Sequence, residues 1–318
     1  MIVHRRSFLG FASATAAMLA LGVQASAADF KAAIVMPGNI TDKSWSQSGY
    51  EAIMGAKEKL GIEVAFSEKV AQPDQAEAMA DYARRGYNVV IGHGGEFQDA
   101  AERVAAKYPD TLFVVNNGHK AGGNIATSAF YYSQFGYLMG YIAGKMSKSG
   151  KAGWIGAQKI QFSTDLNTSF EKGFKDAGGT EVFTAWTNDW DDIAKGKEAA
   201  LNQISQGADV IFPTMDNAVV GSLQAAKEKG VWGFGLYYDA IQDWPDTVLQ
   251  SAIFDIRGAM LDYLTLAKDG KLEAKAYVFD LNTPEAARIG SFHKAVPEDV
   301  QKEVLALAEK MKTGELKP

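Results

Sequence analysis

The sequence contains no cysteine and only four histidines among its 318 residues. The absence of cysteine excludes disulfides, thiol nucleophiles, iron–sulfur clusters and cysteine-ligated zinc. It also excludes a lipid anchor attached through an N-terminal cysteine. Three of the histidines, His93, His119 and His293, lie beyond residue 27, and no two of them have the spacing of metal ligands. We therefore expect no metal site and no cofactor on this chain.

Common motifs of hydrolytic and nucleotide-binding enzymes are also missing. No G-x-S-x-G nucleophile elbow is present, so the H-G-G run at 93–95 carries little weight as an oxyanion loop. The segment 144–151 departs from a phosphate-binding loop in its glycine spacing, and Ala152 follows where a Mg²⁺-binding Ser or Thr belongs. An exported enzyme such as a nucleoside hydrolase stays an alternative, without a catalytic cluster to support it.

Basic charge and long apolar runs are both scarce. The formal net charge is −6, which argues against a protein that grips the phosphates of nucleic acids. Beyond residue 30, no segment approaches the run of about 18 apolar residues that a membrane-spanning helix needs. We therefore expect a soluble mature chain without a nucleic acid partner.

The first 27 residues have the pattern of a cleaved export signal. Adjacent Arg5 and Arg6 precede a weakly apolar run that ends at Val23, and the A-S-A sequence at 25–27 is a small-residue cleavage pattern. The R-R-x-F-L pattern resembles a twin-arginine signal, while a general secretory signal or a short membrane anchor stays an alternative. We predict cleavage after residue 27 and a periplasmic location.

The remaining chain has the composition of a globular α/β protein, with 47% hydrophobic and 22% charged residues. A length of 318 residues suggests two domains or one large α/β unit. Apolar strand patterns alternate with amphipathic helix patterns. Strands are predicted at 31–36, 63–66, 88–91, 111–115, 151–155, 181–186, 209–212, 231–236, 248–253 and 276–281. Helices are predicted at 44–60, 73–85, 97–108, 164–177, 193–206, 217–229, 256–268 and 297–313.

This alternation predicts two parallel sheets with helices on both faces, one before and one after the apolar stretch 135–146. A returning C-terminal strand and helix would make several chain segments cross between the two lobes. Ligands bind at the carboxyl ends of the strands in such sheets. The loops expected to line a cleft are 37–46, 92–97, 116–118, 187–192, 213–217 and 237–239.

Aromatic residues stand at the ends of predicted strands, where a cleft between two lobes would lie. These residues are Trp45, Trp190, Tyr237 and Phe254. Aromatic faces from opposite lobes can sandwich a flat apolar ring and gain on the order of 1 kcal/mol each. Packing roles stay the alternative for each aromatic residue. Polar side chains placed to contact the edges of such a ring are Ser46, Asn117, Asp216, Asp239 and, at a strand end, His93.

Three acidic residues near Trp190 have two interpretations. Asp189, Asp191 and Asp192 could perform acid–base chemistry. The favoured interpretation is that Asp191 or Asp192 caps the helix that begins after them.

The segment D-K-S-W-S-Q-S at 42–48 is similar to the D-K-S-F-N-Q-S signature of the basic membrane protein family. This family comprises purine-nucleoside-receptor-type substrate-binding proteins of ABC importers. The resemblance continues through 92–100, 108–110, 190–197 and 207–212, and it covers about residues 30–317. Each motif is short, but their common order and spacing make the resemblance specific.

The resemblance implies a type I periplasmic binding protein, in which two Rossmann-like α/β lobes with parallel sheets are joined by three hinge crossings. It also implies a small-molecule purine ligand, an ABC permease of the inner membrane as partner, a monomeric chain and no catalysis. The implied lobes are residues 28–128 with about 252–280, and residues 129–251 with about 281–318.

The resemblance also implies individual site residues. The base-stacking aromatics of the family fall on Trp45 and Trp190. The polar positions at the edge of the base fall on Ser46, where the family usually has Asn, and on Asn117, where it usually has Asp.

Two departures from the family pattern concern the sugar. Nucleoside-binding relatives have an acidic residue and a lysine that hold the ribose, whereas this chain has Tyr237 and Phe254 at those positions. Ribose hydroxyls facing an aromatic ring would lose hydrogen bonds, at about 1–3 kcal/mol per unpaired group. We therefore predict a purine nucleobase, adenine or a hypoxanthine-like ring. A nucleoside or a sugar as ligand, and a sensor receptor instead of an importer as partner, stay alternatives.

Overall fold

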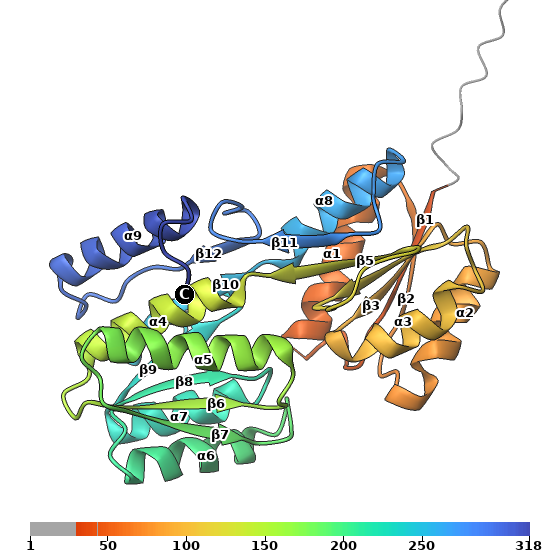
Figure 1. Ribbon diagram of the computed structural model, residues 1–318. Helices are drawn as coiled ribbons and strands as arrows, with labels where there is room; N and C mark the ends of the chain where they lie inside the picture. The colour runs from red at the N-terminus through yellow and green to blue at the C-terminus, as the bar shows by residue number, and fades with distance from the viewer. Residues whose placement is uncertain (1–29, 43) are drawn as a thin grey trace, which may run out of the picture.

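Two six-stranded sheets organise the protein, one in each of two lobes (Figure 1). The computed structural model describes residues 30–42 and 44–318, so the predicted export signal lies outside the described residues. The chain enters the second lobe after about 130 residues and later returns to the first.

Lobe 1 is built on a wholly parallel sheet of order β11-β5-β4-β3-β1-β2. Every residue of β3 is buried, as expected for a central parallel strand that is covered on both faces. The strands are β1 (Lys31–Val35), β2 (Glu63–Ser67), β3 (Val89–His93), β4 (Leu112–Asn116), β5 (Ile125–Phe130) and β11 (Ala276–Phe279). The helices are α1 (Trp45–Leu60), η2 (Gln72–Asp74), α2 (Gln75–Arg84), η3 (Gly95–Phe97), α3 (Gln98–Ala105) and α8 (Ile256–Lys268), which packs on α1.

Lobe 2 is built on a sheet of order β12-β10-β9-β8-β6-β7, in which only β12 is antiparallel to its neighbour. The strands are β6 (Lys151–Gly156), β7 (Glu181–Trp186), β8 (Val210–Thr214), β9 (Trp232–Leu236), β10 (Val248–Phe254) and β12 (Ala287–Ile289). The helices are α4 (Tyr132–Met146), α5 (Gln161–Asp176), α6 (Ile193–Ser205), α7 (Val219–Lys229), η4 (Ala240–Gln242) and α9 (Glu298–Lys312). Helix α4 packs closely on α5, and α9 lies along α4 (Figure 1).

The chain crosses between the sheets three times, from β5 to α4, from β10 to α8 and from β11 to β12. This connectivity confirms the predicted type I periplasmic binding fold with its two lobes. None of the described helices has the length and the apolar character needed to cross a membrane.

The predicted elements are present, and helix α8 has the predicted limits, Ile256–Lys268. Two strands were not predicted. Strand β5 has the sequence I-A-T-S-A-F, which is too poor in large apolar residues to read as a strand. Strand β12 has only three residues and exists through its pairing with β10.

Candidate functional site

A cavity of about 310 Å³ lies between the lobes, at the carboxyl ends of their strands. We call it the cleft cavity. Six predicted site residues line it: Trp45, Ser46, Asn117, Trp190, Asp216 and Tyr237. Other lining residues with polar or aromatic side chains are Asp42, Gln72, Gln75, Glu96, Gln158, Phe162 and Asp191. The structure thus brings strand-end side chains of both lobes to one cavity.

Trp45 is held from behind by His93. The two rings are stacked with their centroids 4.2 Å apart and an interplanar angle of 7°. The indole Nε1 of Trp45 donates to the backbone oxygen of His93 at 3.1 Å, and His93 Nε2 donates to the backbone oxygen of Trp45 at 2.8 Å. The second ring nitrogen of His93 accepts from Asn116 Nδ2 at 2.8 Å, which fixes this tautomer.

His93 is fully buried and is not among the residues that line the cleft cavity, in contrast to the expectation that it faces the cleft. Burial lowers the pKa of His93 to about 4, so the imidazole is neutral near pH 7. His93 therefore positions Trp45 and fills the space behind its ring.

The start of α1 is organised by Asp42. Its carboxylate accepts from the backbone N–H groups of Ser44, Ser46 and Gln47 at 2.7, 3.0 and 3.0 Å. A carboxylate in this place satisfies unpaired donors and complements the positive end of the helix dipole. Ser46 Oγ in turn accepts from the backbone N–H of Gly38 at 3.1 Å. The loop after β1 thus fixes both Trp45 and Ser46 at the cavity wall.

Asn117 follows β4 with a backbone φ of +59°, a conformation that Asn adopts more readily than most residues. Its side-chain oxygen accepts from the hydroxyl of Tyr132 at 2.8 Å. Tyr132 begins α4, at the first crossing between the lobes. The amide N–H groups of Asn117 are therefore the donors that it can offer to a ligand.

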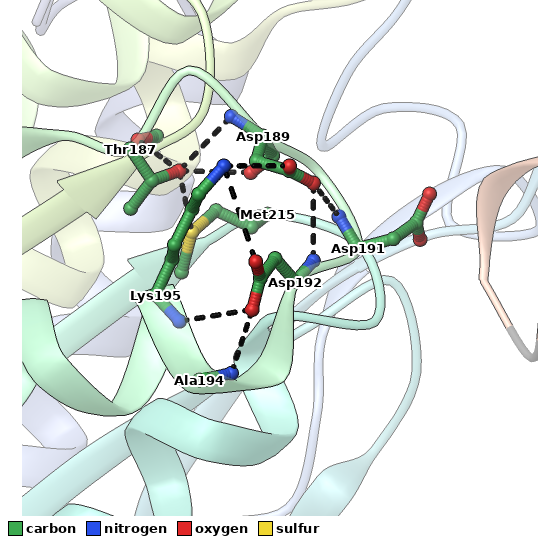
Figure 2. A network of polar contacts seen from close by, with 8 residues as sticks. Thr187, Asp189, Asp191, Asp192, Ala194, Lys195 and Met215 are labelled. Atoms are coloured by element: carbon green, nitrogen blue, oxygen red, sulfur yellow. Dashed lines mark hydrogen bonds and ion pairs between the residues drawn. The ribbon is translucent and has the colours of Figure 1, made fainter.

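A polar network rigidifies the loop that carries Trp190 (Figure 2). Asp189 Oδ1 accepts from the backbone N–H groups of Asp191 and Asp192, both at 3.1 Å, and Asp189 Oδ2 pairs with Lys195 Nζ at 2.9 Å. Asp192 Oδ1 accepts from the backbone N–H groups of Ala194 and Lys195 at 2.9 and 3.1 Å. This geometry confirms the predicted helix cap and identifies it as Asp192. Asp189 is likewise occupied in holding the loop.

The ring of Trp190 stacks on Phe162, with centroids 5.9 Å apart and an interplanar angle of 20°. Phe162 in turn lies 5.0 Å from the ring of Tyr132. Phe162 was not predicted as a site residue, because the loop after β6 was not counted among those expected to line the cleft. The sequence contained the information needed to predict it, because this loop also follows the carboxyl end of a parallel strand.

The described part of the cavity wall is acidic. Asp42, Glu96, Asp191 and Asp216 line the cavity, and no Lys, Arg or His is among its described lining residues. Burial raises the pKa of Glu96. Burial, reinforced by Asp191 and Asp42, raises the pKa of Asp216 well above its usual range. Within the described residues, Asp216 Oδ1 is buried without a hydrogen-bond partner, so a ligand N–H could complete its bonding.

Tyr237 follows β9 and adopts a φ of +70°. Its ring lies 5.9 Å from that of Trp45 and 6.4 Å from that of Phe254. Burial, with a contribution from neighbouring Asp216, raises the pKa of its hydroxyl. Tyr237 is therefore a neutral hydrogen-bonding group on the cavity wall.

Besides His93, two more predicted site residues lie away from the cleft cavity. Phe254 is 3% exposed and packs near the crossings, 4.7 Å from Tyr132 and 4.8 Å from Phe135, measured between ring centroids. Asp239 turns toward the segment after β12 and accepts from the backbone N–H of Ser291 at 3.0 Å. Neither residue is among those that line the cavity, because packing and a turn take up their side chains.

Comparisons with known proteins agree with this architecture. The chain is 30% identical to the transcriptional activator protein med of Bacillus subtilis, over 90% of each chain. It is 29% identical to a purine-binding protein of Brucella abortus, over 96% of this chain and 87% of that protein. A solved transcriptional activator of the comK gene from Bacillus halodurans is 25% identical, with a TM-score of 0.76 over 90% of this chain and 98% of that one.

A solved ABC transporter solute-binding protein from Conexibacter woesei is also 25% identical, with a TM-score of 0.71 over 91% of this chain and 98% of that one. The model of the family described as "ABC transporter substrate-binding protein PnrA-like" matches residues 30–317. The match covers almost all of the described chain and confirms the resemblance found in the sequence. The chain therefore belongs to the Bmp family of PnrA-like ABC transporter substrate-binding proteins.

Proposed function

We propose that this substrate-binding protein carries a purine nucleobase, adenine or a hypoxanthine-like ring, in the cleft cavity. The observation that carries the proposal is that Trp45 of lobe 1 and Trp190 of lobe 2 line one cavity of about 310 Å³. This volume is at the lower end of the roughly 300–1,000 Å³ of small-molecule sites. A flat ring can stack on such aromatics.

The polar groups of the cavity suit the edges of a purine. The carboxyl oxygens of Glu96 and Asp216 can accept hydrogen bonds whether or not the groups are ionised, and a purine offers N–H donors. Asn117 can donate to a ring nitrogen or a carbonyl oxygen. An anionic ligand would face several carboxylates across the described wall, which disfavours it.

Binding and release follow from the hinge. The open protein would take the ring on one lobe, and closure about the three crossings would bring the second tryptophan over it. The closed, monomeric protein would then dock on an inner-membrane permease that uses ATP for uptake. The predicted export signal would place this cycle in the periplasm, and no chemistry would occur on this chain.

A nucleoside is the second candidate ligand. A relative from Lactococcus lactis, 29% identical over 76% of each chain, is named an ABC transporter nucleoside-binding protein. Isothermal titration of refolded, ligand-free protein with adenine, hypoxanthine and their nucleosides distinguishes the two. Tight nucleoside binding without a response to free bases would refute the nucleobase proposal.

Variants test the site itself. Trp190→Ala should weaken base binding by more than about tenfold, because it removes one stacking face. The matched control is Phe66→Ala, which removes an aromatic side chain that is 38% exposed and lies outside the cleft cavity. An unchanged affinity in Trp190→Ala would remove this residue from the site. Mass spectrometry of the denatured protein, applied to ligand that copurifies, gives an independent identification.

A further inference from the structure

A second cavity, of about 460 Å³, adjoins the cleft cavity. Tyr237 and Asp216 line both cavities, so these two side chains form their shared wall. The second cavity is bounded further by Glu51 of α1 and, where the chain crosses from β10 to α8, by Phe254 and Arg257. The space between the lobes is thus divided into two compartments at Tyr237.

Tyr237 is held in an unfavourable backbone conformation. A φ of +70° is unusual for a bulky residue, and such residues keep it only where their surroundings impose it. The backbone N–H of Tyr237 donates to the oxygen of Ala252 at 2.9 Å. The ring is tilted against that of Trp45 and stands edge-on to that of Phe254. It therefore contacts one aromatic side chain that lines the cleft cavity and one that lines the second cavity.

The second cavity offers different chemistry from the cleft cavity. Arg257 Nε pairs with Asp255 Oδ1 at 2.8 Å, and another guanidinium nitrogen lies 3.8 Å from Glu51 Oε2. Donors and acceptors therefore stand together on one part of a wall that otherwise carries apolar side chains, among them Leu223, Trp244 and Ile256. Hydroxyl groups, which both donate and accept hydrogen bonds, can pair with this polar part.

We propose that Tyr237 is a specificity-determining residue that confines the ligand to the cleft cavity and closes off the second cavity. A hydroxylated extension on the same ring, such as a pentose, would fit the second cavity in size and could pair with Glu51 and Arg257, but the Tyr237 ring blocks it. This inference rests on the proposed function, and it gives the physical reason why a base is accepted and its nucleoside is rejected.

Three substitutions distinguish the role of the Tyr237 ring from that of its hydroxyl group. Tyr237→Gly removes the ring and suits the positive φ. Tyr237→Asn also removes the ring, and Asn tolerates this conformation, so it serves if the glycine variant is unstable. Tyr237→Phe keeps the ring and removes only the hydroxyl. If the ring is the barrier, the first two variants should admit the extended ligand and the third should not.

The test is isothermal titration of each full-length mature protein with adenine and with adenosine. The unmodified protein and Tyr237→Phe should bind adenosine at least about tenfold more weakly than adenine. Tyr237→Gly or Tyr237→Asn should reduce that ratio by about tenfold or more. An unchanged ratio in both folded variants would overturn the role of Tyr237 while leaving the proposed function intact. Failure of the unmodified protein to bind any purine base would overturn the proposed function, and this inference with it.

Discussion

Gly49 lies inside α1, directly against the ring of His93, and substituting it tests how Trp45 is supported. A methyl group on Gly49 would stand 2.6 Å from His93 Cδ2 and 2.8 Å from His93 Cε1, closer than real side-chain contacts allow. His93 has little room to retreat, because its ring stacks on Trp45 and both of its nitrogens are hydrogen-bonded. Gly49→Ala should therefore displace the Trp45 ring without adding any group to the cleft cavity.

Gly55 provides a matched control on the same helix. A methyl group at Gly55 would meet no heavy atom within 4 Å. Both substitutions gain about 1 kcal/mol from the higher helix propensity of Ala, so this gain cancels when the two variants are compared. The remaining difference reports overpacking against His93, which costs about 1–3 kcal/mol.

Urea unfolding of the two variants measures this difference. Gly55→Ala should be about 1 kcal/mol more stable than the unmodified protein, and Gly49→Ala should be about 1–3 kcal/mol less stable than Gly55→Ala. Titration with adenine should show weaker binding for Gly49→Ala only. Equal stability and equal affinity of the two variants would refute the view that His93 positions Trp45.

Three further predictions concern titration and the Trp190 loop. The unfolded chain protonates His93 more readily than the folded protein does. His93 should therefore lower the free energy of unfolding by roughly 3 kcal/mol between pH 6.5 and pH 4. Urea unfolding of His93→Asn should show a smaller dependence on pH over this range. The raised pKa of Asp216 makes the free energy of unfolding change in the opposite direction with pH, because this carboxyl group ionises in the unfolded chain first as pH rises. Asp216→Asn should therefore raise the free energy of unfolding at pH 7 and change it little at pH 3. Asp189→Ala should weaken base binding several-fold by loosening the Trp190 loop, while the exposed Glu77→Ala should leave it unchanged in the same titration.

Much of the fold could be predicted because the hydrophobic pattern of most segments agrees with the way these segments are buried in the structure. Strand β3 is buried throughout and apolar up to its last residue, His93, and helix α8 has an apolar stripe and a capping aspartate, Asp255. Strand β5 could not be predicted in this way. Its Thr127 and Ser128 are buried between β4 and β11, and the partner strand β11 lies far along the sequence. Its extended conformation therefore depends on contacts that a local pattern does not contain.

The site could be predicted where position along a strand decides it. Trp45, Trp190 and Tyr237 follow strands, and parallel strands bring their ends together. The sequence could not distinguish a residue at the wall from one behind it. His93 also stands at a strand end, but the Trp45 ring covers it, and Phe254 is drawn into packing near the crossings. These outcomes depend on side-chain packing in three dimensions.

The pairing of β11 with β5 has a consequence for the order of synthesis. The edge of β5 opposite β4 is covered by residues Ala276–Phe279, which the ribosome makes only near the end of the chain. Until then, the nascent first lobe carries an open parallel strand edge, the kind of surface on which chains associate wrongly. The first lobe, whose first strand is made at the start of the described chain, therefore waits for β11 to complete its sheet. A chain released before residue 276 would be prone to aggregate instead of forming a free-standing lobe.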